Sequence, residues 1–291
     1  MFQGVFTAIV TPFNEDGSVC EEDLKRLVDF NIENGVTGIV PMGTTGESPT
    51  LSHEEHLRVI EVVCEHVNGR VPIIAGTGSN STKEALYMTS KAKELGANAS
   101  LQVAPYYNKP TQEGLYRHFK TIADEVDLPM FIYNIPGRTG VNIEPNTIAK
   151  LAEHPNIIGV KEASGSLPQM MDIIKNTPPE FIVLSGDDNL TLPLMAVGGK
   201  GVISVASNIV PDKMSKMVKA GLEGNFEEMR KLHYELLPLF KAEFIETNPI
   251  PIKTALAMKG MIKEVFRLPL CEMSAANKSK LKEVLINLGI I

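Results

Sequence analysis

A lysine and a tyrosine hold matching places in two successive apolar segments of the chain. Lys161 ends the run that begins at Ile157, where a buried strand would ordinarily finish on an aliphatic side chain, and Tyr133 ends the run that begins at Pro129. If the two segments are parallel strands, their carboxyl ends meet at one edge of a sheet, and the two side chains share a pocket. Burial penalises a charged ammonium, and a neutral amine attacks carbonyl carbons. The pair therefore predicts a Schiff-base-forming lysine beside a phenol that can transfer protons.

The alternative interpretation of Lys161 is a surface lysine that only caps a strand, and the organisation of the chain argues against it. Short apolar runs alternate with amphipathic segments of helical period, as in βαβ units, which predicts a (β/α)₈ TIM barrel. A doubly wound open sheet is the other candidate, but Thr11-Pro12-Phe13 is not the glycine-rich fingerprint expected after its first strand. The predicted strands span residues 5–10, 37–41, 72–75, 99–103, 129–133, 157–161, 181–184 and 201–205.

Helices are predicted between these strands and throughout the C-terminal part of the chain. Ser52 with Glu55, and Ser81 with Glu84, have the spacing of capping boxes at two helix starts. The strand pattern stops near residue 225, so we expect a catalytic barrel of residues 1–224 and a C-terminal helical region of residues 225–291 packed on it. The predicted helices include 22–34, 54–67, 82–95, 112–126, 145–153, 226–244, 253–261 and 277–288.

Composition narrows the function classes. The net charge is −7 and the lysines are scattered, which argues against nucleic-acid and anionic-membrane partners. No apolar run approaches the roughly 18 residues that span a bilayer. Cys20, Cys64 and Cys271 are far apart, as expected of a reducing, cytoplasmic compartment. His53 and His56 lack the spacing of a zinc motif, so we predict no metal.

The segments that follow the predicted strands are polar and rich in glycine, whereas those that precede them are ordinary helix-ending turns. Thr44 and Thr45 offer hydroxyl and backbone N–H groups suited to a small carboxylate. Arg138 stands among Pro136, Gly137 and Gly140, and a guanidinium on a stiff turn suits bidentate carboxylate binding. The alternatives are a simple glycine turn and a solvated loop arginine. In a parallel barrel all these tips open on one face, which is where such folds carry function.

With these residues in view, the chain resembles the dihydrodipicolinate synthase family, within the pyruvate-dependent class I aldolase and N-acetylneuraminate lyase superfamily. The resemblance runs from about Gly4 to Leu288 and is strongest in three segments, Gly43–Ser48, Tyr133–Gly140 and Val160–Gly165. It implies a homotetrameric lyase, a dimer of dimers, that condenses pyruvate with L-aspartate 4-semialdehyde in lysine and diaminopimelate biosynthesis. It implies no cofactor apart from the covalent imine with pyruvate.

The resemblance also assigns roles to individual residues. One lysine forms the imine, and a tyrosine relays protons through a threonine to a second tyrosine from a neighbouring subunit. Two threonines hold the pyruvate carboxylate, an arginine holds the semialdehyde carboxylate, and two further positions lie near the imine. The imine-forming lysine is Lys161, and the relay runs from Tyr133 through Thr44 to Tyr107. The two threonines are Thr44 and Thr45, and the arginine is Arg138. The two positions near the imine are Gly186 and Ile203.

A second, regulatory site is implied because some family members are inhibited by lysine at a subunit interface. Pro49 departs from the small residue that inhibited members often carry there. The alternative is structural: Glu84 as a capping residue, and the two histidines on the first turn of a solvated helix. The residues that match the lysine site are Ser48, His53, His56, Asn80, Glu84 and Tyr106.

Two other functions compete with the synthase. A sialic acid or 2-keto-3-deoxy sugar acid lyase would share Lys161 and Tyr133, but sialic acid lyases typically lack an arginine at position 138 and carry Ser-Thr in place of Thr44-Thr45. A catalytically silent barrel that binds lysine or pyruvate as a regulator would be expected to have lost Lys161, Tyr133 or Arg138. The sequence retains all three.

Overall fold

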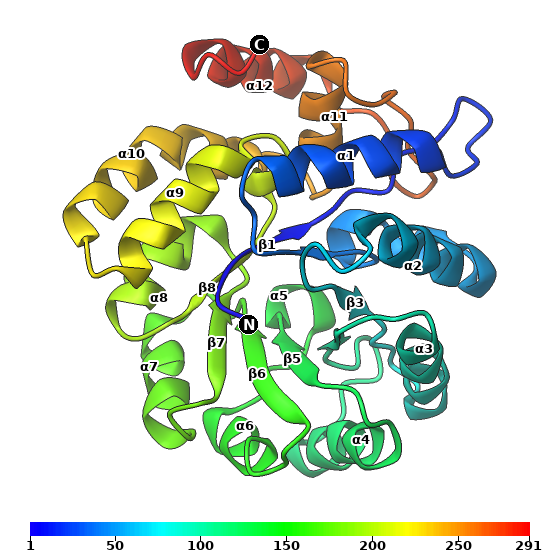
Figure 1. Ribbon diagram of the computed structural model, residues 1–291, viewed down its shortest axis with the longest axis vertical. Helices are drawn as coiled ribbons and strands as arrows, with labels where there is room; N and C mark the ends of the chain where they lie inside the picture. Colours follow the sequence, from blue (N-terminus) through cyan, green and yellow to red (C-terminus); the bar gives the residue numbers. More distant parts are fainter.

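The computed structural model describes residues 1–291 and is a closed barrel of parallel strands (Figure 1). The strand order is β2-β1-β8-β7-β6-β5-β4-β3, and a parallel bridge between Ile39 and Ile73 joins its two ends. Closure confirms the predicted TIM barrel, because an open sheet would leave two unpaired edges. The strands are β1 (Gly4–Ala8), β2 (Gly38–Val40), β3 (Ile74–Gly76), β4 (Ala99–Val103), β5 (Met130–Asn134), β6 (Ile157–Glu162), β7 (Ile182–Ser185) and β8 (Gly201–Ser204).

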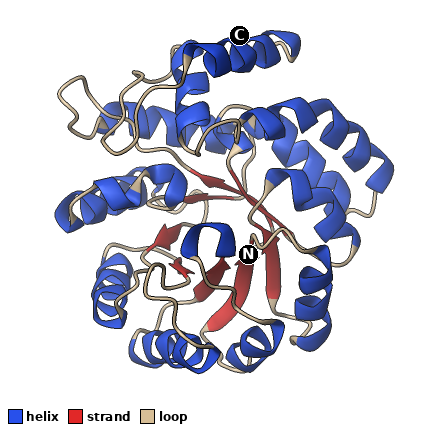
Figure 2. Ribbon diagram, turned by 180° about the vertical axis from the view of Figure 1, so that it is seen from behind, coloured by secondary structure: helices blue, strands red, loops and turns tan.

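Helices surround the strands, as Figure 2 shows from behind. Each predicted strand overlaps an observed one, and the predicted helices agree equally well, because apolar periodicity identifies the faces that must be buried. Short helices follow several strands: η1 (Thr44–Gly46), η2 (Ser48–Thr50), α5 (Pro136–Thr139), η3 (Asp188–Leu190) and η4 (Ala206–Asn208). The outer helices are α1 (Glu21–Glu33), α2 (His53–Val67), α3 (Thr82–Glu94), α4 (Gln112–Glu125), α6 (Pro145–Leu151), α7 (Leu167–Asn176), α8 (Thr191–Ala196) and α9 (Pro211–Leu222).

The inside of the barrel is filled by large side chains. Phe6, Phe131 and Leu184 are fully buried there, and Tyr133 and Ile203 belong to the same cluster. A filled interior means that the barrel is a rigid support and not a pore. The chemistry is thereby confined to the rim.

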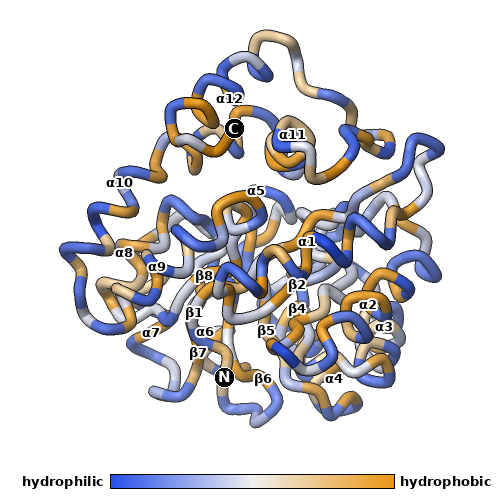
Figure 3. The backbone as a smooth tube through the Cα atoms, turned by 45° about the horizontal axis from the view of Figure 1, so that its top comes forward, coloured by the Kyte–Doolittle hydropathy of each residue, from blue (hydrophilic) through white to orange (hydrophobic).

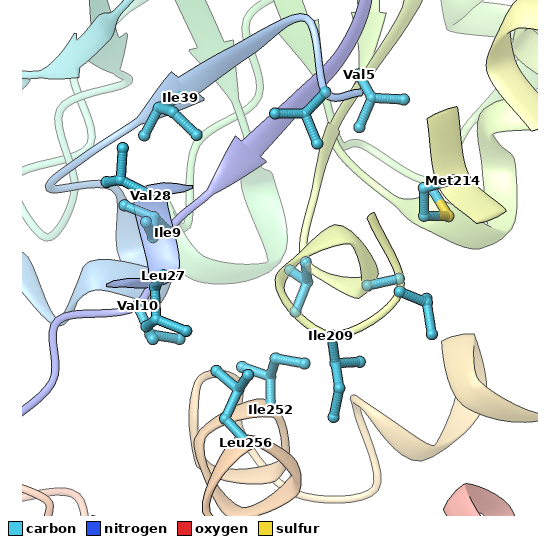
Figure 4. Packing of buried hydrophobic residues seen from close by; sticks show 14 of the residues in the cluster. Val5, Ile9, Val10, Leu27, Val28, Ile39, Ile209, Met214, Ile252 and Leu256 are labelled. Carbon is cyan, nitrogen blue, oxygen red and sulfur yellow. The ribbon is translucent and has the colours of Figure 1, made fainter. Parts of the chain in front are cut away.

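The C-terminal region consists of α10 (Phe226–Ala242), α11 (Ile250–Met258) and α12 (Ala275–Asn287), grouped on one flank of the barrel (Figure 3). It shares its apolar core with the barrel: Ile252 and Leu256 of α11 cluster with Leu27 of α1 and with Ile209 (Figure 4). Residues Ile250–Leu256 of α11 are all buried. This burial holds the chain that leads into α11 firmly against the rest of the molecule.

One of the two predicted capping boxes is present. Ser52 Oγ accepts a hydrogen bond from the Glu55 backbone N–H, and the Glu55 carboxylate accepts one from the Ser52 N–H. At the second position, Ser81 caps α3, but the Glu84 carboxylate turns away from the Ser81 N–H. It accepts hydrogen bonds from His53 and from the hydroxyl of Ser79 instead, so the second prediction was wrong.

Candidate active site

Lys161 and Tyr133 lie side by side at the carboxyl ends of β6 and β5. The strands pair with Tyr133 opposite Lys161, and the Lys161 Nζ lies 4.1 Å from the centre of the tyrosine ring. Both side chains are buried, with 6% of Lys161 and 5% of Tyr133 exposed. No carboxylate forms an ion pair with Lys161. Its amine therefore has no competing partner and can attack a carbonyl carbon brought into the pocket.

The space around the Lys161 side chain depends on Gly186, which follows β7. A Cβ at this position would lie 3.1 Å from Lys161 Cε and 2.7 Å from Ala163 Cβ, so a larger residue would displace the lysine. Ile203 of β8 is buried in the same interior cluster as Tyr133. Gly186 thus borders the Lys161 side chain, and Ile203 packs in the cluster that contains Tyr133; neither supplies a polar side chain.

Glu162 fixes the strand end on the opposite side from Lys161, because successive residues of a strand face opposite ways. Its carboxylate accepts hydrogen bonds from Asn134 Nδ2 at 3.1 Å and from the Ser164 backbone N–H at 2.7 Å. Burial raises the pKa of Glu162, and these hydrogen bonds oppose the shift. They tie the end of β5 to the end of β6, which holds Tyr133 and Lys161 in register.

The turn after β2 brings two threonines to the rim. Thr45 is buried, and Glu47 two residues later adopts a left-handed backbone with φ of 56°. Thr44 lines a small cavity of about 40 Å³ together with Tyr133. Hydroxyl groups that face one small space are suited to pass protons between them.

Arg138 stands on α5, a single turn of helix. Its guanidinium is exposed, and Nη2 donates a hydrogen bond to the backbone carbonyl of Asn248 at 3.0 Å. Arg138 and Thr44 line one cavity of about 430 Å³. A guanidinium and a hydroxyl that line the same cavity can accommodate an anionic substrate of modest size.

Tyr107 points away from this cavity into solvent. It is 90% exposed and has a φ of 72°, in a loop that also contains Lys109 with a φ of 44°. Two amide side chains hold the loop: Asn80 Nδ2 donates to the Tyr106 carbonyl at 3.2 Å, and Asn108 Nδ2 donates to the Asn80 carbonyl at 2.9 Å. Within one chain, the structure does not bring Tyr107 to Tyr133.

The residues predicted to bind lysine lie mostly together. Of the six, only Asn80 does not line the 430 Å³ cavity, because its side chain holds the Tyr106 loop. His53 Nε2 donates to Glu84 at 2.6 Å, and His56 Nε2 donates to the Gly76 carbonyl at 2.7 Å. Burial lowers the pKa of His56 to about 4. The alternative, in which both histidines lie on a solvated helix turn, is wrong for His56, which is buried.

Two further observations concern the binding of a metal ion and the spanning of a membrane. No group of three or more histidine, cysteine, aspartate and glutamate side chains comes close enough to hold a metal ion. None of the helices combines the length and the apolar character needed to cross a bilayer.

Comparison with known proteins agrees with this geometry. The profile of the dihydrodipicolinate synthetase family matches residues 1–288. The 4-hydroxy-tetrahydrodipicolinate synthase of Thermodesulfovibrio yellowstonii is 58% identical over 291 residues, which cover 100% of both chains. The chain belongs to the dihydrodipicolinate synthetase family. It is accordingly an enzyme, a lyase of the class I aldolase type.

Two solved structures of dihydrodipicolinate synthases with bound ligands are similar to the chain over its whole length. The chloride-inhibited synthase of Acinetobacter baumannii, in complex with pyruvate, is 46% identical with a TM-score of 0.98 and covers 100% of both chains. The synthase of Cyanidioschyzon merolae, with lysine bound, is 45% identical with a TM-score of 0.97, over 100% of this chain and 99% of that one.

One residue at the site of this dihydrodipicolinate synthetase family member was not expected from the sequence. Asn248 precedes α11 and contacts both Thr45 and Arg138. Its only sequence signal is its place before Pro249 and Pro251, which favour a stiff turn at a helix start. Nothing local indicates that the turn reaches the barrel rim, because Asn248 and Thr45 are 203 residues apart.

Proposed function

We propose that this protein condenses pyruvate with L-aspartate 4-semialdehyde, through an imine on Lys161, as a 4-hydroxy-tetrahydrodipicolinate synthase of lysine and diaminopimelate biosynthesis. The observation that carries the proposal is the buried Lys161 amine beside the Tyr133 ring, with no carboxylate partner. The relatives that bear the synthase name support the choice of substrates. No cofactor takes part in the proposed reaction.

The chemistry starts with attack of the Lys161 amine on the ketone carbon of pyruvate. A C–N bond forms, water leaves, and the resulting imine loses a methyl proton to become an enamine. The enamine carbon then attacks the aldehyde carbon of the semialdehyde, forming the new C–C bond. Finally the amine of the semialdehyde attacks the imine carbon and displaces Lys161 as the ring closes.

Proton transfers in these steps fall to Tyr133, Thr44 and Tyr107. Thr44 and Tyr133 line one small cavity, which supports a relay between them. Tyr107 is exposed on its own chain and would complete the relay in a neighbouring copy. We therefore propose a homotetramer, a dimer of dimers, in which Tyr107 is covered. Sedimentation velocity tests the assembly, and a monomeric particle with full activity would contradict the shared relay.

Carboxylate binding divides between the two ends of the cavity. Thr44, which lines the cavity, and its buried neighbour Thr45 offer hydrogen bonds to the pyruvate carboxylate, and Arg138 offers a charged fork to the carboxylate of the semialdehyde. A sugar acid lyase would use a polyhydroxylated aldehyde with no need for Arg138. Comparing condensation with the semialdehyde and with sugar aldehydes separates the two, and faster turnover of a sugar aldehyde would favour the lyase.

We further propose that L-lysine inhibits the enzyme from the part of the cavity lined by His53, His56 and Glu84. The support is a carboxylate and two imidazoles close to one another in a cavity that also reaches Thr44 and Arg138. Titrating L-lysine into the assay is the test. Rates that stay unchanged at millimolar lysine would remove the site, and Glu84→Gln should weaken inhibition while leaving the uninhibited rate unchanged.

A further inference from the structure

Asn248 connects the two carboxylate-binding groups of the proposed site. Its side-chain Nδ2 donates to Thr45 Oγ1 at 3.0 Å, while its backbone carbonyl accepts from Arg138 Nη2 at 3.0 Å. Only 4% of Asn248 is exposed. One residue from the C-terminal region thus contacts both proposed carboxylate-binding residues, Thr45 through its side chain and Arg138 through its backbone.

The contact with Thr45 determines what the threonine hydroxyl can do. A hydroxyl has a single proton to donate and accepts through its lone pairs. Since Thr45 Oγ1 already accepts the amide N–H of Asn248 and forms no other hydrogen bond in the structure, its own proton remains free. A carboxylate only accepts hydrogen bonds, so this orientation is the one that pyruvate requires.

The contact with Arg138 is of a different kind, because it uses the backbone. The guanidinium has five N–H donors, and the Asn248 carbonyl occupies one of them. The remaining fork stays available for a carboxylate. A change of side chain at position 248 leaves this carbonyl in place.

The turn that carries Asn248 is held against Thr45 and its neighbours at a second point. Lys253, one helical turn into α11, forms a fully buried ion pair with Glu47, two residues beyond Thr45. The Lys253 Nζ also lies 4.2 Å from the centre of the Phe13 ring. Two contacts between the same segments fix their relative position, so Asn248 meets Thr45 in a defined geometry.

We propose that Asn248 is a positioning residue: its side chain sets the Thr45 hydroxyl as a donor to the pyruvate carboxylate, and its backbone carbonyl orients Arg138 for the second substrate. The inference rests on the proposed function, because it presumes that pyruvate binds at Thr45. It makes an asymmetric prediction. Side-chain changes at position 248 affect pyruvate, and the semialdehyde is largely spared.

The test is a double-mutant cycle with Asn248→Ala, Thr45→Val and the double variant. Asn248→Ala should raise the KM for pyruvate about five- to tenfold, the effect expected from losing one hydrogen bond, and change the KM for the semialdehyde less than about twofold. In the Thr45→Val background, the Asn248 substitution should add less than about twofold, because its action passes through the absent hydroxyl. Asn146→Ala, at an exposed position on α6, is the matched control and should leave both KM values unchanged.

Borohydride trapping with pyruvate distinguishes failure of the inference from failure of the proposed function. If the unaltered enzyme forms no trapped adduct, the proposed function is wrong. If it forms the adduct, and Asn248→Ala needs no more pyruvate for half-maximal trapping, the positioning role is wrong. If the effects of Asn248→Ala and Thr45→Val on the KM for pyruvate simply add in the double variant, the positioning role is also wrong. Additive effects would mean that Asn248 acts independently of the Thr45 hydroxyl. Trapping that saturates fully at high pyruvate in Asn248→Ala shows that the variant is folded and supports the inference.

Discussion

The molecule buries two lysines in different surroundings, and their comparison shows what makes one of them reactive. Lys253 is fully buried and forms an ion pair with the equally buried Glu47. Lys161 is almost as buried, and an aromatic ring lies beside each amine, but Lys161 has no carboxylate partner. Burial alone therefore does not mark a catalytic lysine. The absence of a counter-charge, within reach of a cavity, is the distinguishing feature.

The two lysines also differ in what the surrounding chain requires of them. Burial lowers the pKa of Lys253, and the charge of Glu47 opposes that shift. Such a pair holds two segments together and leaves little freedom for chemistry. Lys161 forms no ion pair that holds segments of the fold together, so its loss should reduce the rate of the reaction far more than the stability of the protein. Lys253 should behave in the opposite way.

The largest expected effect is that of Lys161→Ala. Condensation should fall by at least about 10⁴-fold, because the variant has no nucleophile for the imine. The midpoint of thermal unfolding should move by less than about 4 °C, since no ion pair is broken. Steady-state assays and calorimetry measure the two quantities, and Lys150→Ala at an exposed site is the control. Retained activity would place the nucleophile elsewhere.

Lys253→Met should reverse this pattern. The variant leaves Glu47 buried without a partner, which is expected to lower the free energy of unfolding by about 3–5 kcal/mol. The matched double variant, Lys253→Met with Glu47→Gln, removes the orphaned charge and should regain most of the loss. Urea denaturation measures each step. A double variant as unstable as the single one would show that the ion pair is not the source of the stability.

Arg138→Ala tests whether binding of the semialdehyde can be weakened without affecting imine formation at Lys161. We expect the KM for the semialdehyde to rise about 10- to 100-fold, because a charged hydrogen bond to its carboxylate is lost. The pyruvate concentration for half-maximal borohydride trapping should stay within about twofold. Equal damage to trapping would contradict the assignment of Arg138 to the second substrate.

The smallest effect concerns His56, a buried imidazole without a carboxylate partner. Burial lowers its pKa from 6.5 to about 4. Between these two pH values, His56 is protonated in the unfolded chain but neutral in the folded chain. The resulting stability is complete above pH 6.5 and is lost as the pH falls toward 4. In His56→Asn, the free energy of unfolding should fall by about 2 kcal/mol less between pH 7 and pH 5 than in the unaltered protein. Unfolding at the two pH values measures this, and an unchanged pH dependence would show that His56 is protonated in the folded protein.

Sequence patterns predicted what depends on local periodicity. The apolar runs placed Tyr133 and Lys161 at the ends of adjacent parallel strands, and the structure has them in register. The polar segments after the strands likewise indicated that Thr44 and Arg138 would lie on one face of the barrel, and both line the 430 Å³ cavity. These predictions succeeded because a parallel barrel fixes which strand ends meet.

Long-range contacts were not predictable in the same way. Asn248 reaches Thr45 across 203 residues, and Lys253 reaches Glu47 across 206. Neither pair leaves a local pattern, since side chains that meet through tertiary packing need no common spacing. The burial of His56 against Gly76 of β3 and the turn of Glu84 toward His53 were missed for the same reason, because both depend on tertiary packing around α2.

Mass spectrometry of peptides, after incubation of the protein with pyruvate and borohydride, tests most directly the claim that the unpaired buried lysine is the reactive one. We expect one reduced pyruvate adduct per chain, on the peptide that contains Lys161, with the Lys253 peptide unmodified. An adduct on any other lysine, or none at all on an enzyme that still turns over, would contradict it.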